Sequence, residues 1–159
     1  MALRERFGEA LKAAMKARAA RRVSTLRLML AALKDRDIAN RSENIPDEQK
    51  AAGVGDDEIL TLLAKMIRQR EESAALYESG GRPELAAAER EEIAIIREFM
   101  PRQMSDEDAR GAARNAIAET GAASLKDMGK VMAALKERHA GQMDFGKASA
   151  TVKSLLSGG

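Results

Sequence analysis

Apolar residues recur at intervals of three and four along almost the whole chain, which is the spacing of amphipathic helices. Leu3, Phe7, Leu11 and Met15 predict a first helix with one inward stripe and charged residues elsewhere on its surface. No stretch alternates β-branched and polar residues between turn residues, as a half-buried strand does. The pattern therefore predicts an all-α protein.

A second helix is expected over about residues 23–40, and residues 41–56 then lose the apolar stripe. This second stretch contains Pro46, Gly53 and Gly55, so it predicts a loop with room for one short helical turn after Pro46. A third helix follows, because acidic residues at 56–58 suit the amides and dipole of a helix start.

The third and fourth helices are expected to form an antiparallel hairpin. Gly80 is expected as the left-handed residue that ends the third helix, Pro83 lies in the first turn of the fourth, and Pro101 stops it. The connection leaves room only for a tight turn. Cations on the third helix, Lys65, Arg68 and Arg70, are expected to pair with carboxylates on the fourth, Glu89, Glu91 or Glu92. Such carboxylates also suit a metal or an acid–base pair, but the interspersed cations favour paired surface charges.

Residues 101–104 predict a hinge, and three shorter helices are expected after it. Residues 105–108 form a near capping box, and Ser124 with Asp127 repeats it at the start of the sixth helix. Gly129 lies inside that helix, which predicts close approach of a neighbouring helix or of a ligand's backbone. The organisation predicted is an N-terminal four-helix domain over 1–100 and a small three-helix domain over 101–159.

Composition narrows the function classes. The 159 residues include no cysteine and one histidine, so thiolate nucleophiles, cysteine-based metal sites and multi-histidine sites are excluded. No apolar run approaches the roughly 18 residues needed to cross a bilayer, so no membrane partner is expected. Residues 1–22 are basic and amphipathic like a transit peptide, but Glu5 and Glu9 favour a first domain helix. A cytoplasmic protein without metal or cofactor is expected.

Charge is unevenly distributed along the chain. The net charge is +7 over residues 1–41, −6 over 42–104 and +1 over 105–159. A basic head beside an acidic middle indicates either internal pairing, which is favoured, or a face turned toward a polyanion.

Several stretches together resemble one family. They are Thr25-Leu26-Arg27-Leu28, Lys65-Met66-Ile67-Arg68-Gln69-Arg70 with Glu72-Ser73 and Tyr77, Gly81-Arg82 with Leu85, Glu89 with Glu92-Ile93, Phe99-Met100-Pro101-Arg102-Gln103, and Asp127-Met128-Gly129-Lys130-Val131-Met132. In order and spacing they resemble the YqeY proteins, also called GatB/YqeY domain proteins, over nearly the whole chain. The resemblance implies an N-terminal helical domain and a C-terminal helical domain similar to the tail of the GatB subunit of tRNA-dependent amidotransferase.

That resemblance implies contact with tRNA or with tRNA-linked protein complexes, and a carbon–nitrogen ligase activity that uses glutamine. The chain departs from the GatB tail where the tail has Gly, a basic residue, Ala, Asp and Gly, since residues 141–145 read Gly-Gln-Met-Asp-Phe. A cation and a glycine are therefore replaced in this turn.

Three functions remain open. For a non-catalytic RNA-binding or accessory protein, the candidate contacts are Lys126, Lys130, Lys136, Arg138, His139, Lys147 and Lys153. Lys126 and Lys130 are four residues apart and are expected to share a helix face. Aromatic residues make up only 3% of the chain, so RNA contact is expected through shape and phosphate rather than base stacking.

The other two functions are an amidotransferase that acts with other subunits and a protein-interaction adaptor. Amide transfer needs an activated nucleophile and an oxyanion site, and Ser24, Ser73, Ser105 and Ser124 lie in no glycine-rich loop with a lysine partner. No phosphate-binding loop is present either, so no catalytic residue is assigned. An adaptor would use adaptable methionines, although methionines at helical spacing are more often core residues. These are Met100, Met104, Met128, Met132 and Met143.

Overall fold

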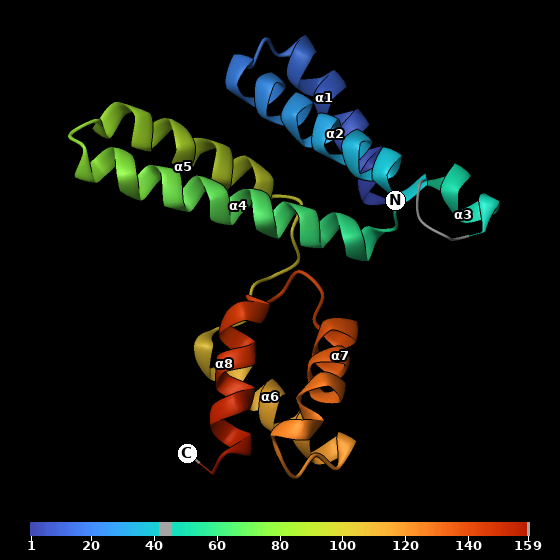
Figure 1. Ribbon diagram of the computed structural model, residues 1–159. Helices are drawn as coiled ribbons and strands as arrows, with labels where there is room; N and C mark the ends of the chain where they lie inside the picture. Colours follow the sequence, from blue (N-terminus) through green and yellow to red (C-terminus); the bar gives the residue numbers. More distant parts are fainter. Residues whose placement is uncertain (42–45, 159) are drawn as a thin grey trace. The chain divides into compact units, whose positions relative to one another are not determined.

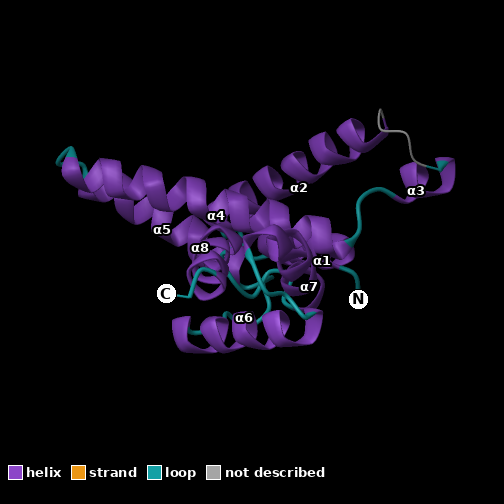
Figure 2. Cartoon of the chain, turned by 60° about the horizontal axis from the view of Figure 1, so that its bottom comes forward, coloured by secondary structure: helices purple, strands orange, loops and turns teal. Residues whose placement is uncertain are grey.

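The structure, a computed structural model, describes residues 1–41 and 46–158. Figure 2 shows helices and loops and no strand in these residues, which confirms the all-α prediction. The residues gather into two compact units, Met1–Met100 and Pro101–Gly159, which we call unit 1 and unit 2. Each unit is described by itself below.

Unit 1 contains a short fifth helix directly after Pro46, where a loop with room for one helical turn was expected. Its helices are α1 (Leu3–Lys16), α2 (Ala20–Arg41), α3 (Asp47–Ala52), α4 (Asp56–Ser79) and α5 (Pro83–Arg97), as labelled in Figure 1. Helix α3 has no apolar stripe, but Asp47 and Glu48 in its first turn suit the helix dipole. The predicted four-helix domain was therefore one short helix too few.

The core of unit 1 is built from large side chains of four helices. Phe7 of α1 is fully buried and meets Phe99 edge-on, with ring centroids 5.0 Å apart. This geometry is favoured by the opposite charges of ring face and ring edge. Around the pair lie Leu26, Met29, Leu33, Ile59, Leu63, Met66, Ile93 and Ile96. The predicted apolar faces of the four long helices therefore form one core, except at Met15, which was expected to face inward and is 51% exposed.

Helices α4 and α5 form the expected hairpin (Figure 1). The left-handed residue at its turn is Gly81, with φ of 73°, whereas Gly80 has φ of −85°. The amide of Arg82 donates to the carbonyl of Tyr77 across this turn at 2.7 Å. The helix end is therefore a Schellman motif with glycine at the strained position, one residue later than expected.

Charged side chains tie the helices of unit 1 together. Arg70 of α4 lies 2.9 Å from Glu92 of α5, and both side chains are less than a fifth exposed. Arg21 of α2 approaches the same carboxylate at 3.8 Å and Glu91 at 3.3 Å. The predicted pairing across the hairpin is confirmed for Arg70, whereas among the described residues neither Lys65 nor Arg68 forms an ion pair with these carboxylates.

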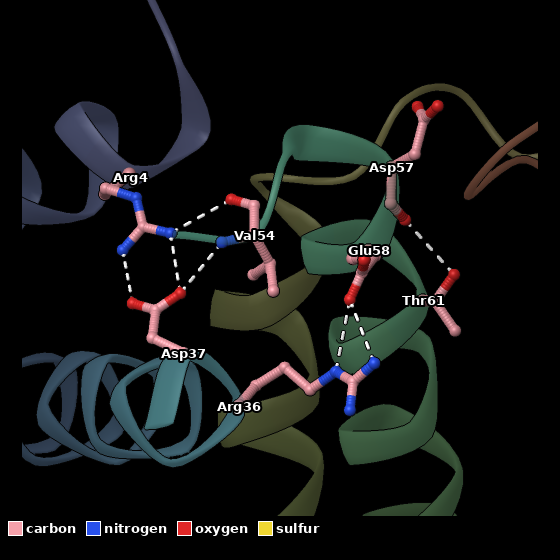
Figure 3. Close-up of polar contacts among 7 residues, drawn as sticks. All are labelled: Arg4, Arg36, Asp37, Val54, Asp57, Glu58 and Thr61. Carbon is pink, nitrogen blue, oxygen red and sulfur yellow. Dashed lines mark hydrogen bonds and ion pairs between the residues drawn. The ribbon is translucent and has the colours of Figure 1, made fainter. Parts of the chain in front are cut away.

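A second cluster holds the start of α1 against α2 and the loop before α4 (Figure 3). The guanidinium of Arg4 donates two hydrogen bonds to Asp37, at 2.7 and 3.0 Å, and one to the carbonyl of Val54 at 3.0 Å. Asp37 also accepts from the amide of Val54 at 2.9 Å. These bonds hold the pKa of Asp37 below its usual range, with the Arg4 hydrogen bond as the largest cause.

The basic segment, residues 1–41, is partly neutralised by the acidic segment, residues 42–104. Besides Arg21, the pairs that join them are Arg22 with Glu98 and Arg36 with Glu58. Arg6 also donates to the carbonyl of Glu98 and lies over the ring of Phe99. These contacts support the favoured alternative, internal pairing, for part of the head.

Unit 2 is a small bundle of three α-helices with an added 3₁₀ turn. It comprises α6 (Asp106–Thr120), η1 (Leu125–Asp127), α7 (Met128–Arg138) and α8 (Phe145–Leu156). Small and aliphatic side chains fill its core: Ala113, Ala116, Val131, Leu135, Met143, Ala148 and Val152. The expected sixth helix is therefore split, since its first turn is η1.

The methionines belong to the cores. Met143 is buried, and Met100, Met104, Met128 and Met132 are half-buried against the two clusters. Their use as packing residues was the favoured alternative, and these contacts support it.

Candidate nucleic-acid interface

Two exposed lysines lie at the start of α7, with an exposed glycine between them. Lys126 lies in η1 and Lys130 in α7, and Gly129 between them is exposed. Because a 3₁₀ turn advances fewer residues per turn than an α-helix, the two lysines do not share a face by simple α-helical spacing. Both still belong to the same helix start, where the dipole favours anions.

Asp127 stabilises this helix start from within. One carboxylate oxygen accepts from the amides of Ala123, at 2.8 Å, and Ser124, at 3.3 Å, and completes a capping box. Its other oxygen lies 3.6 Å from Nζ of Lys130. The amide of Ala123 is the largest cause that lowers the pKa of Asp127, followed by that of Ser124. The carboxylate therefore stays ionised and offsets part of the lysine charge.

No neighbouring helix explains Gly129. A Cβ added at this position would meet no atom within 4 Å among the residues placed by the structure. The first alternative for Gly129, close approach of another helix, is therefore wrong for the described chain. Its surface is open to a ligand.

The C-terminal end of α7 carries a different group. Lys136 is exposed, while Arg138 pairs with Glu119 of α6. The ring of His139 is half-buried, and Nδ1 lies 3.1 Å from Oε1 of Gln142. Two of these three expected RNA contacts already have internal partners.

The turn that departs from the GatB tail is fixed inside unit 2. The carbonyl of Gly141 accepts from the side chain of Gln103 at 2.6 Å, and the carbonyl of Gln142 accepts from the amide of Met104 at 2.8 Å. Gln142 therefore contacts His139 through its side chain and the start of unit 2 through its carbonyl. The sequence did not reveal this role.

Lys147 and Lys153 lie at opposite ends of α8 and are both exposed. Asp144 caps this helix by accepting from the amides of Gly146 and Lys147 at 2.8 and 3.3 Å. The two lysines are six residues apart, which places them about 120° apart around an α-helix. The seven candidate residues thus fall into three groups: the start of α7, its end, and α8.

A shallow groove of about 540 Å³ lies between α6 and the end of α7. Its lining combines small and aliphatic residues with acidic and basic side chains. The lining residues are Met104, Glu107, Asp108, Gly111, Ala112, Arg114, Asn115, Ala116, Glu119, Leu135, Arg138 and His139. Sequence reasoning missed the α6 side of this groove, because alanine and glycine at core spacing predict helix packing just as well.

The serines considered as nucleophiles have structural roles where their partners are defined. Ser24 donates to the carbonyl of Arg21, Ser105 accepts from the amide of Asp108, and Ser124 belongs to the capping box at the start of η1. Across the described residues, no cluster of three metal-ligating side chains is present, and no helix has the length and apolarity to cross a membrane.

Two comparisons with known proteins bear on identity. No curated protein matches the chain. The family model for Yqey-like proteins matches residues 4–156, which is almost the whole chain. The chain therefore belongs to the YqeY family.

Proposed function

We propose that the chain is a non-catalytic accessory protein that binds tRNA or a related RNA through the phosphate backbone. The observation that carries the proposal is the start of α7, where exposed Lys126 and Lys130 flank the open surface of Gly129. Lysine charge and a helix start both favour phosphate. The sequence resemblance implies that unit 2 is similar to the GatB tail, which helps to recognise tRNA, and this supports RNA as the ligand class.

The remaining candidates take secondary places in this proposal. Lys136, Lys147 and Lys153 are exposed and extend the cationic surface, while Arg138 and His139 must first leave Glu119 and Gln142. The carbon–nitrogen ligase chemistry that the family resemblance implies would come from other subunits, to which this chain would bring RNA.

Anisotropy titration of labelled bulk tRNA with the full chain at rising salt tests the proposal. We expect Lys126→Ala with Lys130→Ala to weaken binding and to flatten the plot of log K against log salt by about 1.5, since each lost phosphate contact removes 0.7 to 0.9. The control is Arg102→Ala with Arg110→Ala, which removes the same charge from exposed positions in the same unit. Equal losses from the two pairs, or no tRNA binding, would overturn the proposal.

A further inference from the structure

The first hairpin of unit 1 carries an unusual run of cations. Residues 10–34 contain seven Lys and Arg residues and no Asp or Glu. Two of the seven, Arg21 and Arg22, pair with carboxylates of α5 and the residue that follows it. The other five are exposed, and none makes an ion pair with a residue that the structure describes: Lys12, Lys16, Arg18, Arg27 and Lys34. We call these five the α1–α2 basic surface.

Helical spacing directs four of these cations away from the core, all except Arg18, which lies between the two helices. Lys12 and Lys16 are four apart on α1, opposite buried Phe7 and Ala14. On α2, Arg27 and Lys34 are seven apart and share a face. That face lies opposite the buried side chains of α2, which include Leu26, Met29 and Leu33.

Arg18 occupies a position where glycine is the favoured residue. Its φ is 53°, and it is the only non-glycine residue with positive φ in the described chain. The amide of Arg18 donates to Met15 and that of Ala19 to Ala14, at 3.2 and 3.0 Å, which makes the end of α1 a Schellman motif.

The other helix ends show what the chain normally uses there. The equivalent left-handed residues at the ends of α4 and α6 are Gly81 and Gly121. An L-residue in this conformation is strained, whereas glycine is not. Arginine at the α1 end therefore carries a conformational cost without any described partner for its side chain, which points to a role outside the fold.

We propose that the α1–α2 basic surface is a second RNA-binding surface, which contacts backbone phosphates without reading bases. Unpaired, outward cations are what a polyanion requires, and the hairpin offers no aromatic ring on its exposed face for base stacking. This surface is independent of the start of α7, but the identity of its ligand as RNA rests on the proposed function.

An anionic membrane is the less favoured polyanion. A helix that lies on a membrane inserts an apolar face. The apolar stripe of α1 faces the core instead, where Leu3 is 5% exposed and Phe7 is fully buried. The exposed large apolar residues of the two helices, Met15, Leu28 and Ile38, are each about half exposed and are widely spaced along the chain. The α1–α2 hairpin therefore has exposed cations but no exposed apolar face that would insert into a membrane.

The test is the same tRNA titration with the full chain and variants of α1. Lys12→Ala with Lys16→Ala should reduce the magnitude of the slope of log K against log salt concentration by about 1.5, the value for two lost phosphate contacts. Lys65→Ala with Arg68→Ala is the matched control, because both cations are exposed on a helix of the same unit. Its salt dependence should stay that of the unchanged protein.

Arg18→Gly separates binding from folding. It should weaken tRNA binding severalfold while the thermal midpoint stays equal or rises, since glycine relieves the left-handed backbone. A lower midpoint, or unchanged affinity together with an unchanged salt dependence in the Lys12/Lys16 variant, would overturn the proposal.

The outcomes distinguish the two RNA proposals. Loss of binding only in the Lys126/Lys130 variant removes the α1–α2 basic surface and leaves the proposed function. Loss of binding only in the α1 variants removes the start of α7 as an RNA contact and supports the α1–α2 basic surface. No tRNA binding at all removes both, and binding to phosphatidylserine vesicles that depends on Lys12 and Lys16, without tRNA binding, assigns the surface to membranes and overturns our inference.

Discussion

Unit 1 and unit 2 are both helical but are held together by different forces. Unit 1 encloses large side chains, with Phe7 edge-on to Phe99, and joins its helices through ion pairs such as Arg70 with Glu92. Unit 2 has a core of small and aliphatic residues, and defines its helix ends through caps at Ser105 and Asp144.

This difference decides which charges remain for a partner. In unit 1 most arginines of α4 and α5 meet a carboxylate, so their charge serves the fold. The cations of unit 1 without a described carboxylate partner concentrate on the α1–α2 hairpin. In unit 2 several lysines have no described carboxylate partner, and Arg138 with Glu119 is the ion pair described between its helices. A cation is therefore informative about binding only after its internal partners are known.

The largest expected effect is in the core of unit 1. Phe7→Ala removes a fully buried ring and its contact with Phe99, and should lower the free energy of unfolding of unit 1 by about 3–5 kcal/mol. Hydrogen exchange should show lost protection in α1, α2, α4 and α5, with α6–α8 unchanged. Leu28→Ala, at a site 47% exposed, is the control and should change stability by less than about 0.5 kcal/mol. Equal loss of protection in both units would show that they unfold as one.

The next effect tests the charged links of unit 1. Asp37→Ala leaves Arg4 and the amide of Val54 without their acceptor, and should cost about 1.5–3 kcal/mol. Because the pKa of Asp37 is lowered by folding, its contribution is complete above the unfolded pKa of about 3.9 and is lost as the pH falls through the lower folded value.

Urea unfolding at several pH values checks this expectation. The unchanged protein should lose more stability on acidification than the Asp37→Ala variant does. Asp35→Ala is the control, because Asp35 is exposed on the same helix and has no ion pair with a described residue. A cost as large as that of Asp37→Ala would show that general charge, rather than the Arg4 cluster, stabilises unit 1.

The long helices were predictable because their apolar spacing and their glycine and proline boundaries are local signals. Helix α3 was predicted only as one helical turn after Pro46, because its six residues have no apolar stripe that would show how far the helix extends. The left-handed residues Gly81 and Arg18 depend on where each helix stops, to within one residue. Sequence spacing does not resolve that boundary.

The candidate site was less predictable than the fold. Exposure of Lys126 and Lys130 follows from helical pattern, but the pairing of Arg138 with Glu119 depends on how α6 and α7 cross. The role of Gln142 depends on a long-range bond to Met104. Gly129 was misjudged in part, since a glycine in a helix signals close approach without saying whether the neighbour belongs to the chain.

A smaller effect is expected at a cap of unit 2. Asp144→Ala removes the acceptor for the amides of Gly146 and Lys147, and should cost about 0.5–2 kcal/mol. Exchange of the first amides of α8 should accelerate more than that of the core residue Val152. Glu137→Ala, at an exposed α7 position without a described ion pair, should leave both unchanged. An equal change in this control would remove the cap as the cause.

The smallest effect, at Gly129, has the opposite sign. Gly129→Ala should stabilise unit 2 by about 0.5–1 kcal/mol, because alanine restricts the unfolded chain and the added Cβ meets no atom within 4 Å. Thermal unfolding measures this gain, and Ala133→Gly, at an exposed position of the same helix, should lose a similar amount. If a ligand's backbone approaches at Gly129, the more stable variant should bind tRNA more weakly. A gain in stability with unchanged binding would show that no ligand backbone contacts Gly129 and that Lys126 and Lys130 act on the ligand only through their charge. A loss of stability would show that the fold itself requires Gly129.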